Sequence, residues 1–352
     1  MPRLLDLLQV AVDRGASDLH VTVGQPPVLR VHGELVRMDA PNLTPADTNE
    51  MLDEVLADQH REVFKDWGEV DFSLSLPGIG RFRINAFRQR GTIGMACRLI
   101  PQAIPSIDSL GLPPVVGELT NRRQGLILVT GPTGSGKSTT LAAMIDKINR
   151  ERAEHILTIE DPIEFLHRHE RSIVNQREVG SDTRSYAHGL RAALREDPDV
   201  ILIGEMRDLE TTQAAVSAAE TGHLVLATLH TPGAAEAVHR ILDIFPPYQQ
   251  QQIRTQLALV LQAVISQQLL RRADRPGRVV AAEVLVVTPA IRNLIREGKV
   301  HQIHSMMQAG GQLGMQTMEQ ALQSLYQRGV ISKAQMDLYA PEAGLLQRLL
   351  QR

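Results

Sequence analysis

The sequence predicts an α/β protein in which a small α+β domain precedes a P-loop NTPase domain with a mainly helical C-terminal part. Three observations predict this architecture. Beyond about residue 121, short apolar runs alternate with longer amphipathic segments, which is typical of parallel strands connected by helices. Before about residue 110, short strand-like runs alternate between apolar and polar residues. The 352 residues also exceed what one core usually supports, so we expect two domains.

The domain boundary is predicted from proline punctuation. Four prolines interrupt one short stretch of the chain: Pro101, Pro105, Pro113 and Pro114. We therefore expect a linker within about residues 101–118. Residues 1–112 are assigned to the N-terminal α+β domain, and residues 113–352 to the NTPase domain with its helical C-terminal region.

The N-terminal domain is expected to begin with a helix and to continue as an antiparallel sheet. One apolar helical face is made of Leu4, Leu5, Leu8 and Val12, and Gly15 ends that helix. Five runs have the pattern of strands: residues 19–23, 28–31, 34–38, 81–87 and 92–100. The turn between the second and third strand is placed at His32-Gly33.

The second domain is expected to be a doubly wound sheet covered by helices. Its predicted strands are residues 126–130, 156–160, 200–204 and 224–228, and its predicted helices include residues 184–195 and 210–219. After residue 250 we expect mainly helices, the first with one apolar face made of Ile253, Leu257, Val260, Leu261, Val264 and Ile265. Thr288 and Pro289 begin a further helix that Gly298 ends.

Composition excludes several classes of protein. The net charge of −3 gives no general bias toward nucleic acid. No apolar run approaches the roughly 20 residues of a membrane-spanning helix, and the first residues lack a signal-peptide pattern, so we expect a cytoplasmic protein. Cys97 is the single cysteine, which excludes intrachain disulfides and cysteine-rich zinc sites. It is expected to be a small buried apolar residue.

The strongest functional signal lies between a predicted strand and a predicted helix, in the context of a Walker A loop. The residues expected to contact nucleotide are Gly131, Pro132, Thr133, Gly134, Ser135, Gly136, Lys137, Ser138 and Thr139. The glycines let successive backbone N–H groups point into one concavity at a helix N-terminus. Lys137 can contact the β- and γ-phosphates, and the Ser138 hydroxyl can bind Mg²⁺. The segment therefore predicts binding of a nucleoside triphosphate.

Two acidic motifs follow predicted strands of this domain. Glu205 ends the apolar run that begins at Asp199, where a carboxylate can hold Mg²⁺ directly or through its waters. The second motif, residues 160–164, holds three carboxylates and in most proteins would be only a solvated loop. After this strand, an acid such as Glu164 can orient and deprotonate the attacking water. Glu164 and Glu205 are both candidates for the general base, and the sequence leaves the choice open.

A histidine and several arginines complete the set of candidate catalytic residues. His230 follows a predicted strand at its carboxyl end, where a sensor of the γ-phosphate would lie, whereas His223 lies at the opposite end and is expected to be structural. Five arginines lie on predicted strands of the N-terminal domain or between them: Arg81, Arg83, Arg88, Arg90 and Arg98. They form either an exposed basic sheet edge or a source of positive charge for a neighbouring subunit's triphosphate.

Together these residues resemble the type IV pilus retraction ATPases, which are PilT-like members of the secretion ATPase superfamily. The resemblance runs from near residue 1 to about residue 335. Besides the Walker A loop, it is carried by residues 15–20 (GASDLH), 159–164 (IEDPIE), 175–180 (NQREVG), 220–223 (ETGH) and 290–297 (AIRNLIRE). The last of these resembles the carboxy-terminal signature of retraction motors.

The resemblance implies a PAS-like first domain, a RecA-like ATPase domain and a homohexameric ring that hydrolyses ATP with Mg²⁺. It implies that nucleotide binds between the two domains and that Arg83 and Arg98 match the arginines that reach an adjoining site. It further implies a cytoplasmic motor for pilus retraction and twitching motility. Such a motor associates peripherally with the inner membrane through a pilus platform protein and acts indirectly on pilin.

The family's motifs map onto the acids and histidines already described. Residues 160–164 match its Asp box, Glu205 its Walker B acid, and His223 with His230 its His box. The chain departs from the family at Thr231-Pro232-Gly233, where Thr-Asn-Ser or a similar run is common. The departure leaves the ATPase assignment intact but puts the path of this loop in question.

Three alternatives are weighed against retraction. Pilus extension and type II secretion motors usually carry a four-cysteine zinc module, which a chain with one cysteine cannot build. A nucleic-acid motor of RecA-like fold would need a basic channel, and no nucleic acid is expected at this net charge. An accessory ring subunit would lack a catalytic acid or the P-loop lysine, whereas this chain has the lysine and both candidate acids.

Residues 290–297 are either a packing helix or a coupling surface, with Arg292 and Arg296 available to neighbours.

Overall fold

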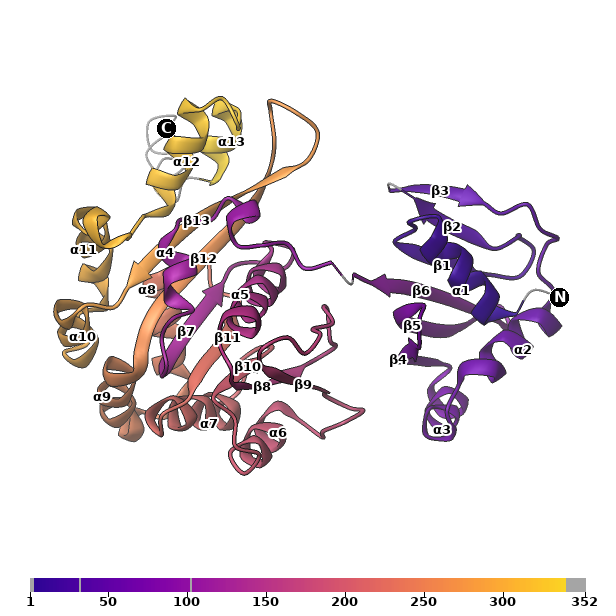
Figure 1. Cartoon of the computed structure of the whole chain (residues 1–352), viewed down its shortest axis with the longest axis horizontal. Helices are drawn as coiled ribbons and strands as arrows, with labels where there is room; N and C mark the ends of the chain where they lie inside the picture. Colours follow the sequence, from indigo (N-terminus) through magenta and orange to yellow (C-terminus); the bar gives the residue numbers. More distant parts are fainter. Residues whose placement is uncertain (1–2, 32, 102, 340–352) are drawn as a thin grey trace. The chain divides into compact units, whose positions relative to one another are not determined.

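The computed structural model describes residues 3–31, 33–101 and 103–339 and divides into two compact units (Figure 1). The units are Met1–Gln102 and Ala103–Arg352, so the division falls inside the expected linker region and earlier than the predicted boundary at residue 112. His32, which was placed in a turn, lies outside the described residues.

The described part of the first unit contains one antiparallel sheet with strand order β3-β2-β1-β6-β5-β4 (Figure 1). Its strands are β1 (Asp18–Val21), β2 (Val28–Val31), β3 (Glu34–Arg37), β4 (Glu69–Leu76), β5 (Gly80–Gln89) and β6 (Thr92–Ile100). Its helices are α1 (Leu4–Asp13), α2 (Pro45–Val55) and α3 (Asp58–Trp67). The prediction of a small α+β domain is confirmed, although α2, α3 and β4 were not predicted.

The core of the first unit lies between these helices and the inner face of the sheet. Leu4 and Leu8 of α1 pack with Phe82 and Ile84 of β5, and all four are fully buried. Cys97 belongs to the same core, and burial raises the pKa of its thiol to about 12. A thiol with this pKa is inert at neutral pH, which confirms the interpretation of Cys97 as an apolar core residue.

The described part of the second unit is built on one sheet with strand order β13-β12-β7-β11-β10-β8-β9. Its strands are β7 (Gly125–Thr130), β8 (His155–Glu160), β9 (Ile173–Glu178), β10 (Val200–Ile203), β11 (Leu224–Leu229), β12 (Leu261–Arg271) and β13 (Arg278–Val286). All neighbours are parallel except β12 and β13. Every residue of β7, β10 and β11 is buried, as expected for parallel strands covered on both faces.

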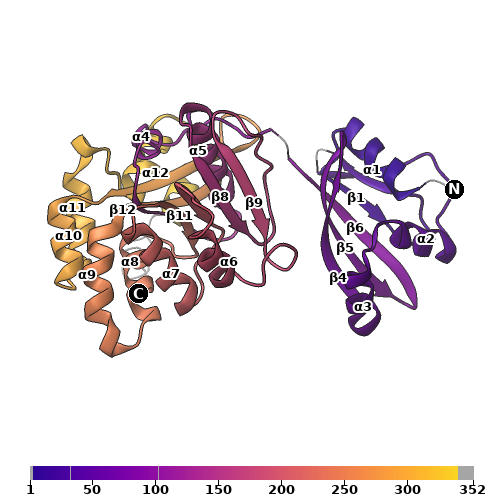
Figure 2. The ribbon, with the colours of Figure 1, turned by 60° about the horizontal axis from the view of Figure 1, so that its bottom comes forward.

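Helices cover both faces of this sheet (Figure 2). One core holds residues of α4 (Val115–Leu119) and α5 (Lys137–Glu151). The opposite core holds residues of α6 (Tyr186–Ala193), α7 (Leu209–Glu220), α8 (Ala234–Ile244), α9 (Gln250–Val260), α10 (Pro289–Arg296) and α11 (Ile303–Ala309). The doubly wound α/β prediction is confirmed. Among the helices that the structure describes, none is both long and apolar enough to cross a membrane.

The remaining elements are short or lie at the end of the described chain. The 3-10 turns are η1 (Asp108–Leu110), η2 (Pro247–Gln249), η3 (Val300–Gln302) and η4 (Gly311–Leu313). The last helices are α12 (Met318–Gln327) and α13 (Lys333–Tyr339). Leu322 of α12 packs with Leu270 of β12 and Ala281 of β13 in a separate small core.

The prediction of a helix with an apolar face over Ile253 to Ile265 is wrong in its second half. Helix α9 ends at Val260, and strand β12 begins at Leu261. Val264 and Ile265 are fully buried in β12, which pairs with β7 on one side and β13 on the other. A continuous apolar run fits a buried helix and a strand covered on both faces equally well, so only the pairing partners decide between them.

Candidate nucleotide-binding site

The carboxyl ends of four neighbouring parallel strands, β7, β11, β10 and β8, meet at one edge of the second sheet. The loop 131–136 follows β7, and His230 follows β11. Glu205 follows β10 after one glycine, and residues 161–164 follow β8. Ligands of open α/β sheets bind at this edge. The sheet order therefore gathers four motifs that are up to a hundred residues apart in the sequence.

The loop after β7 has the backbone conformation that a phosphate cradle requires. Gly131, Gly134 and Gly136 have φ values of 137°, 79° and 93°, in the region that side chains disfavour. Gly131 has a second constraint, because a Cβ atom there would lie 2.4 Å from the backbone oxygen of Gln267. The loop leads directly into α5, whose first residue is Lys137.

The amine of Lys137 is held at the mouth of this loop. Its Nζ donates hydrogen bonds to the backbone oxygens of Gly131 at 2.9 Å and Pro132 at 3.0 Å. Burial lowers the pKa of Lys137, while the negative charges of Glu164 and Glu205 act in the opposite direction. A phosphate oxygen is a stronger acceptor than a backbone carbonyl, so the amine can exchange these partners for a triphosphate.

The acidic cluster 160–164 is divided between two environments. The exposed Glu164 accepts a hydrogen bond from the Ser138 hydroxyl at 2.8 Å, beside the P-loop. Glu160 instead accepts hydrogen bonds from Thr158 at 2.6 Å and from Gln176 at 3.2 Å, and burial raises its pKa. Glu160 therefore joins β8 to its neighbour β9, whereas Glu164 contacts Ser138, the predicted magnesium ligand in the first turn of α5.

Glu205 lies beside His230. Each residue follows the carboxyl end of its strand, and the two strands, β10 and β11, are neighbours in the sheet. The Nε2 atom of His230 is 3.4 Å from Oε2 of Glu205, and Nε of Arg207 is 2.7 Å from the same oxygen. The Glu205 side chain is only 14% exposed. His223, at the other end of β11, has its Nδ1 2.9 Å from the backbone oxygen of Ala218, which agrees with the structural role expected for it.

Arg83 and Arg98 lie together on the first unit, directly opposite each other on β5 and β6. Each has a carboxylate partner within its own unit. Nε of Arg83 lies 3.1 Å from Asp71, and Nε of Arg98 donates to Asp18 at 2.9 Å. Burial acts to raise the pKa of Asp18, but hydrogen bonds from Ser17 and Arg98 lower it overall. The action of these arginines on another subunit's phosphate stays a proposal.

Two polar residues that support the site were not predicted. Gln267 of β12 donates from Nε2 to the Thr140 hydroxyl of α5 at 2.8 Å, while its backbone restricts Gly131. Its neighbour Ser266 donates to the backbone oxygen of Pro232, in the loop after His230, at 2.8 Å. The sequence did offer a signal, since these polar residues directly follow the apolar run that ends at Ile265, but that run was assigned to a helix.

The two arginines of α10, the helix with the AIRNLIRE pattern, have different surroundings. The prediction that both are available to neighbours is wrong for Arg292. Arg292 donates to the backbone oxygens of Ala258, at 2.8 Å, and Leu259. These carbonyls belong to the last turn of α9, which has no partners for them within its own helix. Arg296 is exposed, and no hydrogen bond or ion pair of its side chain is found in the described part of the chain.

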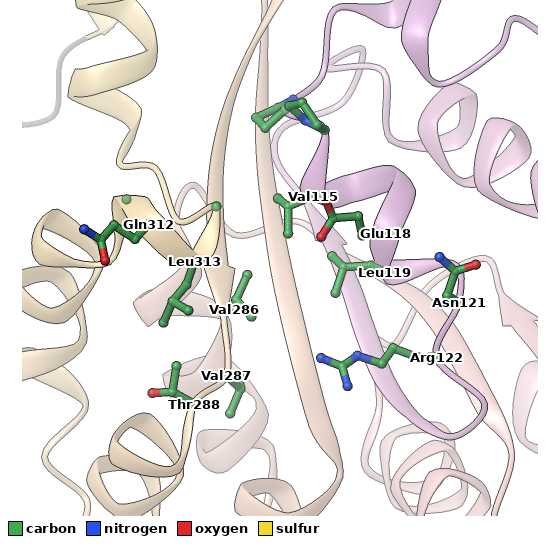
Figure 3. A pocket seen from close by; sticks show the side chains of 14 residues that line it. Val115, Glu118, Leu119, Asn121, Arg122, Val286, Val287, Thr288, Gln312 and Leu313 are labelled. Atoms are coloured by element: carbon green, nitrogen blue, oxygen red, sulfur yellow. The ribbon is translucent and has the colours of Figure 1, made fainter.

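A cavity of about 850 Å³ lies in the second unit, between the segment that contains α4 and the end of β13 (Figure 3). Leu119 and Arg122 line one side, and Thr288 and Leu313 line the other. The described residues that line it include none from the P-loop or the acidic motifs. The cavity is therefore distinct from the phosphate-binding edge.

A family model described as type II/IV secretion system protein matches residues 2–336. The chain belongs to this family. It is 48% identical to the type IV pilus retraction ATPase PilT of Pseudomonas aeruginosa over 330 residues, which cover 94% of the chain and 96% of the relative. It is 50% identical to a twitching motility protein of Neisseria gonorrhoeae, over 87% of the chain and 82% of the relative.

Solved structures of this family have the same fold. The crystal structure of the pilus retraction motor PilT with bound ADP matches with a TM-score of 0.91 and 52% identity, covering 99% of the chain and 100% of its own. The ATPase DotB of Legionella pneumophila matches with a TM-score of 0.83 and 28% identity, and the match covers 97% of the chain and 94% of DotB. The expected resemblance and the RecA-like ATPase domain preceded by a smaller domain are thereby confirmed, and the ADP-bound relative supports nucleotide binding.

Proposed function

We propose that the chain is an ATP-hydrolysing motor that drives type IV pilus retraction and hence twitching motility. One observation carries the proposal: Lys137, Glu164, Glu205 and His230 converge at the carboxyl edge of one sheet. The chain has this arrangement while matching retraction ATPases over nearly its whole length. A soluble domain with a P-loop, two carboxylates and a polar sensor has the groups that phosphoryl transfer to water requires.

The residues of the P-loop bind the triphosphate. Backbone N–H groups of residues 131–136 and the N-terminus of α5, up to Thr139, surround the phosphates, and Lys137 contacts the β- and γ-phosphates. The hydroxyl of Ser138 and the carboxylate of Glu205 are hard oxygen donors of the kind that Mg²⁺ prefers, so the residues fit a magnesium ion held directly or through water. Bound Mg²⁺ neutralises charge that develops on the phosphate oxygens.

The two acids then have separate roles. Glu205 is largely buried and already contacts Arg207 and His230, which suits a residue that holds magnesium or its waters. Glu164 is exposed and can be reached by the attacking water, whose proton it accepts as the general base. His230, next to Glu205, contacts the γ-phosphate and changes position when that phosphate leaves.

The assembly is a homohexamer in which Arg83 and Arg98 of one subunit contact the triphosphate of the next. Both arginines lie on β-strands, which hold a guanidinium in a defined direction. Each must leave its carboxylate partner, Asp71 or Asp18, to do so. Hydrolysis passes around the ring and is transmitted to an inner-membrane pilus platform protein and through it to pilin. The motor works in the cytoplasm, peripherally at that membrane.

The test combines biochemistry and motility. The purified chain should hydrolyse ATP only with a divalent cation, and DNA should leave the rate unchanged. Deleting its gene in a piliated host should abolish twitching and increase surface pili, and the wild-type gene should restore both. A chain that hydrolyses ATP faster with DNA, or a deletion with fewer pili, contradicts the proposal.

An accessory ring subunit is the second candidate, because the chain is also 43% identical to the type IV pilus ATPase PilU of Pseudomonas aeruginosa over 98% of its length. The two candidates differ in whether the chain suffices for retraction. In a host that lacks every other retraction ATPase, the proposed motor restores twitching, and an accessory subunit does not.

A further inference from the structure

A buried carboxylate outside the predicted motifs lies where two helices begin. Glu283 on β13 is 7% exposed. No ion pair of Glu283 is found among the residues that the structure describes. Its partners are backbone N–H groups, because Ala234 donates to Oε1 at 2.6 Å and Met318 donates to Oε2 at 3.3 Å. A carboxylate without a cation is rarely buried, so this position calls for an explanation.

Both N–H groups belong to the first residue of a helix. Ala234 begins α8, whose N-cap Gly233 has no side chain to accept a hydrogen bond, and Met318 begins α12. The first N–H groups of a helix have no partner within the helix, and the positive end of the helix dipole favours an anion there. Glu283 therefore joins the start of α8 to the start of α12. Its own burial raises its pKa, which the two hydrogen bonds oppose.

The segment that leads into α8 comes directly from the nucleotide site. Only residues 231–233 separate His230 from Ala234. This segment is held at a second point, because the Ser266 hydroxyl donates to the backbone oxygen of Pro232 at 2.8 Å. Ser266 and Glu283 are directly paired across β12 and β13. One cross-strand pair therefore holds the chain after His230 at two points, Pro232 in the loop and Ala234 at the start of α8.

We propose that Ser266 and Glu283 are positioning residues that set the place of His230 opposite Glu205, and that Glu283 connects this loop to α12. The inference rests on the proposed hydrolysis of ATP. Neither residue touches nucleotide, and both act through the backbone of residues 231–234. These two anchors decide how Thr231-Pro232-Gly233 is held.

Hydrogen exchange tests the anchoring without relying on catalysis. Replacing Glu283 by Leu removes both acceptors at similar volume, so exchange in peptides 230–236 and 316–322 should become at least about threefold faster. Ser266→Ala should accelerate only peptide 230–236. Asp243→Asn is the matched control, because it neutralises an exposed carboxylate near the opposite end of α8 and should change neither peptide. Unchanged exchange in both peptides of Glu283→Leu overturns the proposal, whether or not the wild type hydrolyses ATP.

Steady-state kinetics test the consequence for His230. Glu283→Leu and Ser266→Ala should each lower kcat about tenfold with KM within about threefold, since the misplaced group acts after binding. In a His230→Ala background each should lower kcat less than twofold further, because both act through His230. Equal losses in the two backgrounds, or normal kcat despite faster exchange, overturn the positioning role. Should Glu283→Leu fail to fold, Ser266→Ala tests whether the loop after His230 is anchored, and Glu283→Gln tests whether Glu283 anchors the start of α12. By contrast, a wild-type chain without ATPase activity contradicts the proposed function itself.

Discussion

The two sheets of the molecule carry their functional charges in opposite ways. On the second sheet, charged and polar side chains follow the carboxyl ends of parallel strands, at one edge. On the first sheet, they form a row across antiparallel strands, in which Arg30 opposes Asp18, Asp18 opposes Arg98, and Arg98 opposes Arg83. Asp18 pairs with Arg30 and Arg98, and Asp71 pairs with Arg83, so each arginine of the row has a carboxylate partner within its own unit, although Arg98 and Arg83 are like charges in opposed positions.

The difference teaches where a charge is ready to act. At the edge of the second sheet, the partners found in the described part of the chain are backbone carbonyls for the Lys137 amine and a hydroxyl for the Glu164 carboxylate. A phosphate or magnesium can replace these partners. On the face of the first sheet, Arg83 and Arg98 have carboxylate partners. An arginine must lose that partner before it contacts a phosphate. Lys137 and Glu164 can therefore bind nucleotide and magnesium directly, whereas Arg83 and Arg98 can bind a phosphate only after they separate from their carboxylate partners.

The largest expected effect is at the carboxyl edge of the second sheet. Lys137→Ala should lower kcat at least about 10³-fold, because the amine contributes charge where it develops on the phosphates. The melting temperature should stay within about 2 °C, since the side chain supports no apolar core. Lys147→Ala on the same helix is the control, because that half-buried lysine pairs with Glu151, farther along the helix from the P-loop. Turnover of Lys137→Ala near the wild-type rate would contradict the Walker A assignment.

The next largest effect separates the two acids of that edge. Glu164→Gln and Glu205→Gln should each lower kcat about 10²-fold or more. Glu205→Gln should also raise the Mg²⁺ concentration needed for half-maximal activity, whereas Glu164→Gln should leave it unchanged. Glu170→Gln, an exposed acid beyond the same loop, is the control. A shift of the magnesium requirement in Glu164→Gln alone would reverse the two assigned roles.

A smaller loss is expected for the arginines of the row on the first sheet, which have carboxylate partners. Arg83→Ala and Arg98→Ala should each lower kcat about 30-fold, less than a single arginine finger supplies, because two arginines share the role. Mixing either variant with Lys137→Ala should restore activity at about a quarter of the sites, where an intact P-loop meets an intact arginine from a neighbour. Fluorescence transfer between labelled subunits must first show that the rings exchange.

The matched control for the row is Arg30→Ala, because Arg30 also neighbours Asp18 at 3.8 Å but is not one of the proposed fingers. It should keep at least half of the wild-type kcat. Freely exchanging mixtures that remain inactive would count against action between subunits, and an equal loss in Arg30→Ala would show that the row matters only as a folded sheet.

The smallest effect extends the same contrast between partnered and unpartnered arginines to α10. Arg292→Ala should lower the free energy of unfolding by about 1–2 kcal/mol, because two backbone carbonyls at the end of α9 lose their donor. Arg296→Ala should change it by less than about 0.5 kcal/mol. Denaturant titration measures both. Arg296→Ala should keep ATPase activity within twofold and still abolish twitching, whereas loss of its turnover would make the helix purely structural.

Much of the fold and of the site could be predicted because its signals are local. A Walker A loop is one contiguous segment, and the wholly apolar runs of β7, β10 and β11 have few alternatives once a P-loop precedes them. Acids at Glu164 and Glu205 and the histidine at His230 were recognised because each follows such a strand directly. Neighbouring carboxyl ends then brought these residues to one edge.

The sequence by itself therefore determined the kind of domain, the phosphate cradle and its catalytic candidates, since these depend on patterns within about ten residues. Tertiary structure alone decided that residues 261–271 are a strand, that Glu160 is structural while Glu164 faces the P-loop, and that Arg292 binds the end of α9. It also placed Ser266 and Glu283 beside the loop after His230. The physical reason is that periodicity states which residues are apolar, whereas burial and hydrogen-bond partners come from segments far away in the chain.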